Sequence, residues 1–168
     1  GGGRIDAGIL AHTHRVWLSD SNDALERLRM QHDAALFLPA AVTGSHVGPR
    51  KSHTSGRVLS MSFRAWVAAQ RHFGFEMDLR ELTEEEAATL KAITSWWKAN
   101  RGWMIAGTIH RLDSDDPALV AEVQVAADGR RFVLFSGEAE TSVQILPRPL
   151  RLAGLEPEAM YRVRLVNR

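Results

Sequence analysis

The sequence has no cysteine and no long apolar run, and each absence excludes a class of protein. Without cysteine, the chain forms neither a disulfide framework nor a thiolate metal site. No apolar segment reaches the roughly 20 residues that a transmembrane helix needs, and no signal peptide opens the chain. We therefore expect no membrane partner and a cytoplasmic location.

A strong net charge is also missing. The sequence carries 21 Lys and Arg against 20 Asp and Glu, which gives a formal net charge of +1. The basic residues are scattered rather than clustered, so we expect no nucleic-acid partner. What is present is a 168-residue chain that is 45% hydrophobic and 24% charged, a composition typical of a globular protein with a core.

The first 21 residues are predicted to form a turn, an extended segment and a second turn. The extended segment ends at Trp17, and Asp20 follows it, just ahead of a helix-start signal at Asp23. Active sites of parallel α/β folds are built at the carboxyl ends of strands, so Asp20 is a candidate catalytic residue. Because the chain begins inside a glycine-rich turn and lacks an initiator Met, we expect a fragment of a longer protein.

Helical spacing and a capping pattern predict the first helix. It runs from Asp23 to Leu38, with Asp23 as the N-cap and a Glu three residues later, and Pro39 stops it. The expected buried stripe consists of Leu25, Leu28, His32, Ala35 and Leu36. An apolar run at 40–47 then suits a buried parallel strand whose carboxyl end lies near His46.

Two further helices are predicted before the pattern changes. The second covers 57–73, and the third begins with a capping box at Thr83–Glu86 and runs to about Arg101. Trp96 and Trp97 lie within the third helix and point about 100° apart, so they form no flat platform for a sugar. Packing inside the protein is the favoured role for both side chains.

From Thr108 the apolar period falls to two, which predicts antiparallel strands. Asp128-Gly129 between two such runs is a hairpin signal, and Pro147 and Pro149 belong at an edge or in a loop. The expected strands lie within 108–111, 119–125, 132–135, 150–152 and 161–165.

The order strand, helix, strand, helix predicts parallel βα units. Two such units cannot close a (β/α)8 barrel, which needs at least about 200 residues. We therefore predict an α/β plus all-β chain. Residues 1–107 would hold the last βα units of a (β/α)8 TIM barrel, and residues 108–168 would form a C-terminal antiparallel β-sandwich-like domain.

Three other sets of polar residues are candidates for functional sites. His12 and His14 would share a strand face, the minimal geometry for a metal site, but no third ligand has suitable spacing, so we expect no metal. Arg4 and Asp6 would also share a strand face, where a salt bridge is favoured over substrate contact. His46 is expected to hold its edge of the sheet together by a hydrogen bond rather than to transfer a proton.

Several strings in the chain resemble one enzyme family. GGGRIDAGIL followed by VWLSDSNDALERLRMQ is similar to the retaining α-galactosidases of glycoside hydrolase family thirty-six, where Cys-x-x-Gly-Gly-Gly-Arg-Phe-Asp precedes Trp-x-Ser-Asp-x-x-Asp-Ala-x-x-Arg-Leu. The strings GSHVG, FGFEMDL and GLEPEAMYRV resemble further family strings. The matches keep their order and span nearly the whole chain, so the resemblance is specific.

The resemblance implies the last part of a melibiase-like enzyme that hydrolyses terminal α-D-galactosyl residues of raffinose- or melibiose-type oligosaccharides with retention. Asp20 occupies the place of the family's general acid/base, and Gly1 occupies that of a residue lining the galactose site. No cofactor is implied, and the full-length enzyme is expected to be a homo-oligomer. The family's nucleophile, an Asp in Lys-Trp-Asp, is absent from this sequence, so we expect the isolated fragment to be inactive.

A retaining glycosidase needs two carboxyl groups about 5–5.5 Å apart, one as nucleophile and one as proton donor. Spacing alone favours a helix cap as the role of Asp20, although Asp23 caps better, and the resemblance favours catalysis. A second hypothesis is a non-catalytic carbohydrate-binding or interaction module, with Trp103, Tyr161 and Phe135 as stacking residues. A third keeps the fold but changes the substrate to an α-N-acetylgalactosaminide or to a galactosyl acceptor.

Overall fold

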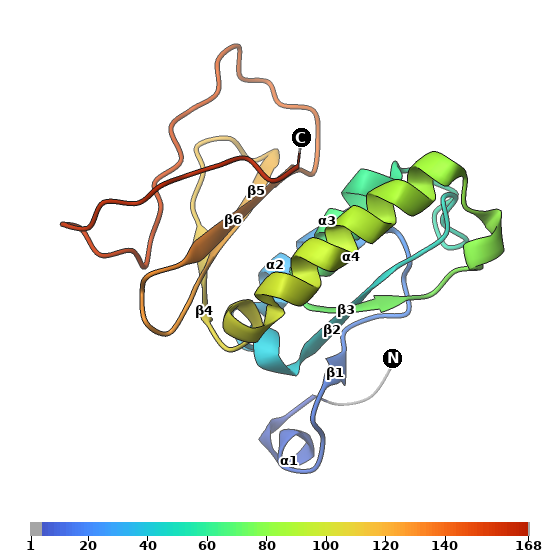
Figure 1. Cartoon of the computed structure of the whole chain (residues 1–168), viewed down its shortest axis with the longest axis horizontal. Helices are drawn as coiled ribbons and strands as arrows, with labels where there is room; N and C mark the ends of the chain where they lie inside the picture. The colour runs from blue at the N-terminus through green and yellow to red at the C-terminus, as the bar shows by residue number, and fades with distance from the viewer. Residues whose placement is uncertain (1–4, 168) are drawn as a thin grey trace.

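The computed structural model describes residues 5–167, in which two small sheets lie on either side of a layer of helices (Figure 1). The strands are β1 (Val16–Trp17), β2 (Thr43–Val47), β3 (His72–Phe75), β4 (Thr108–Leu112), β5 (Leu119–Val125) and β6 (Phe132–Glu138). The helices are α1 (Ala7–Leu10), α2 (Ala24–Ala34), α3 (Met61–Ala69) and α4 (Glu84–Ile105), with 3₁₀ turns η1 (Ala40–Val42) and η2 (Leu79–Glu81). A parallel sheet β1-β2-β3 and an antiparallel sheet β4-β5-β6 are thus both present.

The segment before β1 differs from the expected extended segment. The Asp6 carboxylate accepts a hydrogen bond from the Ile9 N–H at 3.0 Å and thereby caps α1. An Asp side chain in this position favours a helical turn over a strand, so the extended prediction is wrong for these residues. Only Val16–Trp17 form a strand here.

The described residues of the polar pairs that were predicted to share a face of that strand therefore do not lie on a strand. His12 lies in the turn that follows α1, and His14 lies in irregular chain, so the shared strand face is wrong for both. Arg4 lies outside the described residues, and Asp6 is a helix cap rather than a strand residue. Within residues 5–167, no three His, Asp or Glu side chains gather as a metal-binding group.

Helix α2 begins as predicted but ends early. Asp23 is its N-cap, whereas the backbone beyond Ala34 tightens into i→i−3 hydrogen bonds ahead of Pro39. The buried residues are Ala24, Arg27, Leu28 and Gln31, so Leu28 is confirmed and the other predicted members of the stripe are not fully buried. Leu36 is 62% exposed, so its predicted burial is wrong. Hydropathy did not predict the buried face of α2 because two of its residues, Arg27 and Gln31, are polar and form hydrogen bonds inside the protein.

The predicted strand at 40–47 splits into two elements. Residues 40–42 form η1, and β2 follows at Thr43–Val47 with every residue buried. The carboxyl end of β2 lies beside His46, as predicted. A strand buried along its whole length is typical of a parallel sheet.

The second predicted helix, 57–73, is shorter than expected and is followed by a strand that the pattern missed. Ser60 caps α3 by accepting a hydrogen bond from the Phe63 N–H at 3.2 Å, so the helix begins after Ser60. β3 then pairs in parallel with β2 from His72 to Phe75. The strand has only four residues, too few for its alternation to be distinguished from the end of an amphipathic helix.

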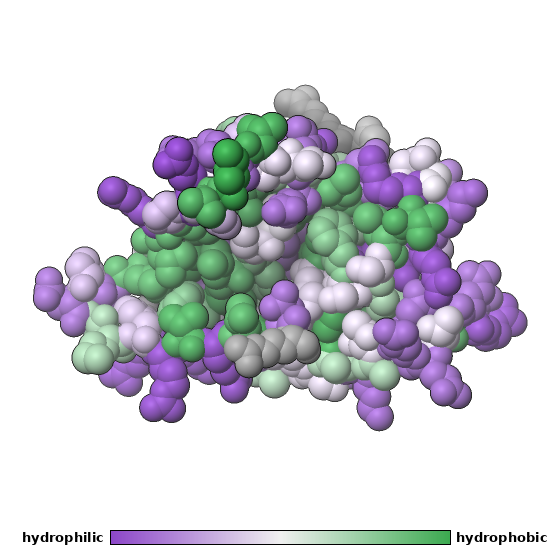
Figure 2. All heavy atoms as spheres, turned by 90° about the horizontal axis from the view of Figure 1, so that it is seen from above, coloured by the Kyte–Doolittle hydropathy of each residue, from purple (hydrophilic) through white to green (hydrophobic). Residues whose placement is uncertain are grey.

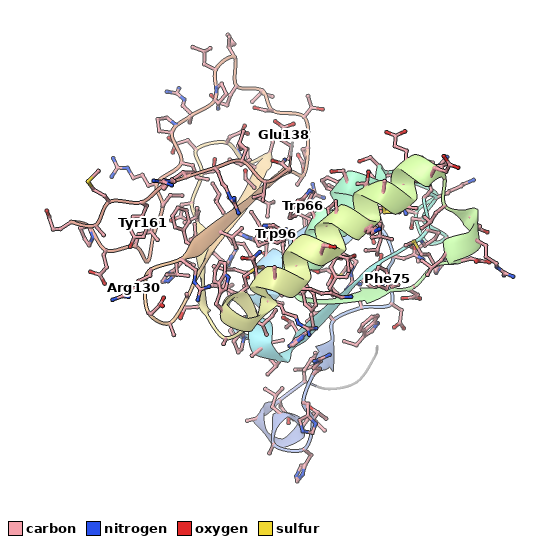
Figure 3. All side chains as sticks on the ribbon, in the orientation of Figure 1. Trp66, Phe75, Trp96, Arg130, Glu138 and Tyr161 are labelled. Atoms are coloured by element: carbon pink, nitrogen blue, oxygen red, sulfur yellow. The ribbon has the colours of Figure 1, made fainter. Side chains whose placement is uncertain are left out.

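The third predicted helix is confirmed as α4, and it extends to Ile105. Its capping box forms in both directions, with Glu86 N–H donating to Thr83 Oγ1 and Thr83 N–H donating to Glu86 Oε2, each at 3.2 Å. Trp97 is buried and donates from Nε1 to a backbone carbonyl, and Trp96 meets Trp66 edge to face at 4.9 Å. Figure 3 shows Trp66 and Trp96 between α4 and the antiparallel sheet, so the predicted packing role is confirmed.

The antiparallel sheet confirms the predicted hairpin but not the later strands. Gly129 has φ of +67°, a conformation that suits glycine in the turn between β5 and β6. No strand forms in residues 139–167, so the expected strands at 150–152 and 161–165 are wrong. The apolar residues there alternate without a partner strand in the described chain; Val163, for example, is 72% exposed.

The core crosses from one sheet to the other through the helices. Val47 of β2, Met104 of α4 and Phe135 of β6 belong to one buried cluster. Two fork contacts of 2.5 and 2.8 Å join Arg71, just before β3, to Glu122 of β5. The division into domains at residue 107 remains a prediction, as do the closed barrel and the β-sandwich. No helix within residues 5–167 is long and apolar enough to cross a membrane.

Candidate functional site

The carboxyl ends of the parallel strands share one edge of the sheet. β1 ends at Trp17, β2 at Val47 and β3 at Phe75. Asp20 is exposed and belongs to the segment that leaves β1 at this edge. The carboxylate therefore lies at the kind of edge where parallel α/β folds build their sites.

Asp23, and not Asp20, caps the helix that follows. Its Oδ1 accepts hydrogen bonds from the N–H groups of Leu25 at 2.9 Å and Glu26 at 3.3 Å, so the helix-cap interpretation of Asp20 is wrong. Its Oδ2 accepts from Ser55 Oγ at 2.5 Å and also pairs with Arg57. Burial alone would raise the pKa of Asp23, but these hydrogen bonds and the Arg57 charge outweigh it and lower the pKa.

A polar hollow of about 490 Å³ adjoins Asp20. It is lined by Leu18, Ser19, Asp20, Ser21, Glu26, His53 and Thr54. These residues come from the segment after β1, the first turn of α2 and the loop after β2. Two carboxylates, three hydroxyls and an imidazole make a lining that can donate to and accept from the hydroxyl groups of a polar ligand.

Arg27 of α2 lies beneath the segment that carries Asp20. Its Nη1 donates to the carbonyl oxygens of Ser19 at 3.0 Å and Ser21 at 2.9 Å. Its Nε donates to Ser45 Oγ at 3.3 Å and its Nη2 to the Gly44 carbonyl at 3.4 Å. Burial lowers the pKa of Arg27 to about 10, so the side chain stays charged at neutral pH.

Trp17 and His46 stack at the same edge. Their ring centroids lie 4.7 Å apart with an interplanar angle of 11°, and Gly44 leaves room for the indole because a Cβ there would approach Trp17 Cε3 to 3.3 Å. The Trp17 residue is 42% exposed, whereas the His46 side chain is fully buried. One aromatic surface near Asp20 is thus both fixed and accessible.

His46 does not make the hydrogen bond that the sequence predicts. Its Nε2 lies 3.0 Å from Glu76 Oε2, but out of line for a hydrogen bond, and neither ring nitrogen has a partner in the described part of the chain. Burial lowers the pKa of His46 to about 4, the charge of Arg27 acts in the same direction, and the charge of Asp20 opposes both. His46 is therefore neutral at pH 7 and holds the edge by stacking.

The loop after β2 is tied to the start of α2 by polar contacts. Asn22 Nδ2 lies 2.5 Å from His53 Nδ1, and Asn22 Oδ1 accepts from Ser52 Oγ at 3.0 Å. A side chain at Gly48 would bring its Cβ to 2.5 Å from Asn22 Cβ, so glycine is required for this approach. With Nδ1 accepting from Asn22, a neutral His53 carries its proton on Nε2 and keeps a donor for the hollow.

The sequence prediction placed Asp20 but missed most of its neighbours. Arg27, His53 and Glu76 all lie at this edge, and none was singled out. Two signals were available for Arg27: it is a basic residue on the buried stripe of a helix, and it matches the Arg of the family string Asp-Ala-x-x-Arg-Leu. Gly1, the other predicted substrate-binding residue, lies outside the described residues.

A second hollow has a different character. It measures about 650 Å³, lies between α3 and β6, and has Glu138 as the one ionisable residue among its described lining residues. Figure 2 shows apolar residues gathered toward the side of the molecule that holds the antiparallel sheet, and Figure 3 places Trp66 and Glu138 on this side of the helices. Its lining offers packing surface rather than a constellation for catalysis.

The stacking residues of the binding-module hypothesis are not brought together as a sugar platform. Phe135 is 7% exposed and belongs to the core, which contradicts its predicted role. Trp103 has the Arg131 guanidinium 5.6 Å from its ring centre, and Tyr161 packs on Phe132 at 5.5 Å.

Comparisons with known proteins identify the family that this chain resembles. The Melibiase family model matches residues 1–107. The α-galactosidase of Escherichia coli is 34% identical over 167 residues, which cover 99% of this chain and 24% of that protein. The α-galactosidase AgaA of Geobacillus stearothermophilus is 34% identical over 166 residues, which cover 97% of this chain and 22% of that protein.

Solved structures show the same likeness. A GH36 α-galactosidase AgaA variant from Geobacillus stearothermophilus, in complex with 1-deoxygalactonojirimycin, matches with a TM-score of 0.86 and 34% identity over 94% of this chain and 22% of that one. A second AgaA variant, in complex with raffinose, matches with a TM-score of 0.85 and 33% identity over 93% and 22%. The chain spans about a quarter of the length of the relatives it matches. Because the family model covers more than half of its residues, the chain belongs to the Melibiase family.

Proposed function

We propose that this chain is the C-terminal part of a GH36 α-galactosidase that hydrolyses terminal α-D-galactosyl residues with retention. Its relatives are α-galactosidases, and related structures hold raffinose and stachyose, which supports raffinose-type oligosaccharides as the substrate class. The role of this chain in the reaction is to supply the general acid/base, Asp20.

One observation carries the assignment of Asp20. Its carboxylate follows β1 at the carboxyl edge of the parallel sheet and lines the polar hollow there, while Asp23 takes over the task of capping α2. Asp23, and not Asp20, is therefore the N-cap of α2. An exposed carboxylate in a sugar-compatible hollow is the kind of group that acid/base catalysis uses.

The chemistry assigned to Asp20 has two steps. In the first, the protonated carboxyl group gives its proton to the glycosidic oxygen while a second carboxylate, outside this chain, attacks the anomeric carbon. In the second, the ionised Asp20 takes a proton from water, which attacks the anomeric carbon and releases galactose from the second carboxylate. Since the nucleophile is absent here, we expect the 168-residue chain alone to be inactive.

The neighbours of Asp20 suit a sugar ligand. Trp17 presents an aromatic surface, which can cover the apolar face of a pyranose ring, and His53 with the hydroxyls of Ser19 and Thr54 can bond its hydroxyl groups. Gly1 is kept in this proposal as a residue that lines the galactose site. We further propose that the complete enzyme is a cytoplasmic homo-oligomer that works without a metal ion or cofactor.

The leaving group tests the acid/base role in the complete enzyme. Replacing Asp20 by Ala should lower kcat/KM for raffinose by about 10²–10⁴-fold, the usual contribution of a positioned general acid. The loss on an aryl α-galactoside with an acidic phenol should be much smaller in its first step, because that leaving group departs without protonation. Steady-state and burst kinetics on both substrates measure the difference.

The exposed Asp115 provides the matched control, since Asp115→Ala removes a carboxylate away from the hollow. It should leave both rates within about twofold of the wild type, as expected for a surface substitution. Equal losses on raffinose and the aryl substrate in Asp20→Ala would refute the acid/base role. An aryl α-N-acetylgalactosaminide assayed in parallel decides between the two substrate classes.

A further inference from the structure

One guanidinium nitrogen of Arg27 forms hydrogen bonds with the residues on both sides of Asp20, the proposed acid/base. Arg27 Nη1 donates two hydrogen bonds, to the carbonyl oxygens of Ser19 at 3.0 Å and Ser21 at 2.9 Å. These are the residues immediately before and after Asp20. The backbone of the turn is therefore fixed on either side of the Cα atom that carries the carboxyl group.

The same side chain ties that turn to the next strand. Its other nitrogens reach Ser45 Oγ and the Gly44 carbonyl of β2 at 3.3 and 3.4 Å. Its guanidinium carbon lies 5.7 Å from the centre of the Trp17 ring, which is itself stacked on His46. Arg27 thus connects the turn that carries Asp20 to strand β2 of the sheet.

Burying the Arg27 cation without an ion pair costs free energy, which is unusual for a residue with a purely structural role. Arg27 is 1% exposed, and in residues 5–167 it forms no ion pair. The charge of Glu76 acts on Arg27 without forming an ion pair, and together with the hydrogen bonds to carbonyl oxygens it offsets the desolvation penalty only in part. The other two fully buried arginines, Arg64 and Arg71, each have a glutamate partner.

We propose that Arg27 is a positioning residue that holds Asp20 against the glycosidic oxygen, a role that rests on the proposed function of Asp20. Its planar fork explains why arginine is used. Four acceptors surround it in different directions, and the three hydrogens of a lysine ammonium at the end of a flexible stem cannot reach all four. A lysine here would keep the charge and lose the clamp.

Arg27→Lys in the complete enzyme is the test, and Arg64→Lys is its matched control. Arg64 is equally buried and also donates to a backbone carbonyl, that of Gly48, but it forms no hydrogen bond with residues 19–21. We expect Arg27→Lys to lower kcat on raffinose by about 10–100-fold, because an error of about 1 Å in placing a catalytic group has effects of this size. The rate of the galactosylation step on the aryl galactoside should fall less than about twofold.

A merely structural role gives a different pattern. Partial unfolding reduces the amount of active enzyme and lowers both rates by one factor, as we expect for Arg64→Lys. Equal losses in Arg27→Lys, or no loss on raffinose, would overturn the proposal. A wild-type enzyme without activity on any α-galactoside would instead reject the proposed function.

Crystal structures of the two variants give a readout that does not depend on activity. The backbone of residues 19–21 should shift relative to β2 in Arg27→Lys and stay in place in Arg64→Lys. An unshifted Asp20 turn in Arg27→Lys would overturn the clamp whatever the substrate.

Discussion

Two buried arginines mark two differently built regions of the molecule. At the carboxyl edge of the parallel sheet, Arg27 meets three carbonyl oxygens and a hydroxyl and forms no ion pair within residues 5–167. At the seam between helices and antiparallel sheet, Arg71 forms a two-pronged contact with Glu122 and also donates to the Gln31 carbonyl at 2.9 Å.

The difference lies in how the buried charges are compensated in the two regions. At the seam the buried charges are paired, since Arg71 meets Glu122, and Gln124 Nε2 donates to the Gln70 carbonyl at 2.8 Å, although Gln31 Oε1 and Gln124 Oε1 have no hydrogen-bond partner among the described residues. Among the described residues, Arg27 at the edge has the charge of Glu76 nearby but no ion pair, and the buried imidazole of His46 has no hydrogen bond. Unmatched buried groups lower stability, and they concentrate where a protein positions reactive groups.

The largest effect on stability should follow from breaking the seam. Glu122→Gln leaves Arg71 as an uncompensated buried charge, which should lower the free energy of unfolding by about 3–5 kcal/mol. Urea denaturation of the variant and the wild type measures it. The double variant Arg71→Met, Glu122→Leu should recover much of this loss, and a double variant as unstable as the single one would contradict the assignment.

His46 at the carboxyl edge should make the stability of the chain depend on pH. The pKa of His46 is about 4 in the folded chain and near 6.5 when unfolded, so the unfolded chain binds its proton first as pH falls. Stability from this group is complete above pH 6.5 and decreases toward pH 4, by on the order of 2 kcal/mol.

Unfolding curves of wild type and His46→Gln between pH 7 and pH 4.5 isolate this term. Burial also lowers the pKa values of His32 and His72, but both residues remain in the variant, so their contributions cancel in the difference. The variant should show a flatter profile. Parallel profiles would mean that His46 is not held neutral by the edge.

A smaller effect is expected at the start of α2. Asp23→Ala removes the N-cap and the contacts to Ser55 and Arg57, and should cost about 1–2 kcal/mol of unfolding free energy. Asp33→Ala, at an exposed position of the same helix, is the control and should stay within about 0.5 kcal/mol. Thermal melts suffice, and a cap effect no larger than the control would contradict the description of this edge.

Local chemistry was predictable wherever neighbouring residues decide it. The Thr83 capping box, the Asp23 cap and the Gly129 turn each depend on contacts within a few residues, and all three are confirmed. The strand β3 was missed because its stability comes from pairing with β2, which is distant in sequence. The same reason explains why apolar alternation in residues 139–167 predicted strands that have no partner in the described chain.

The candidate site was predictable only as a single residue. Asp20 could be named from a resemblance and from its place after an extended segment. Its neighbours were not given roles, because a match of Arg27 to the family string does not say what the side chain contacts, and His53 is one polar residue in a polar loop. Their importance comes from three-dimensional contacts with Ser19, Ser21 and Asn22.

Helix α2 joins the two regions over a single turn. Arg27 on its first turns holds the Asp20 segment, and the carbonyl of Gln31, four residues later, receives the Arg71 hydrogen bond. Four residues of helix span about 6 Å, so the two anchors share one short rigid rod. The antiparallel sheet supplies none of the residues that line the hollow, but it is connected to the Asp20 segment through α2. Substitutions that weaken the contact between Arg71 and Glu122 should therefore displace the proposed proton donor before the chain unfolds.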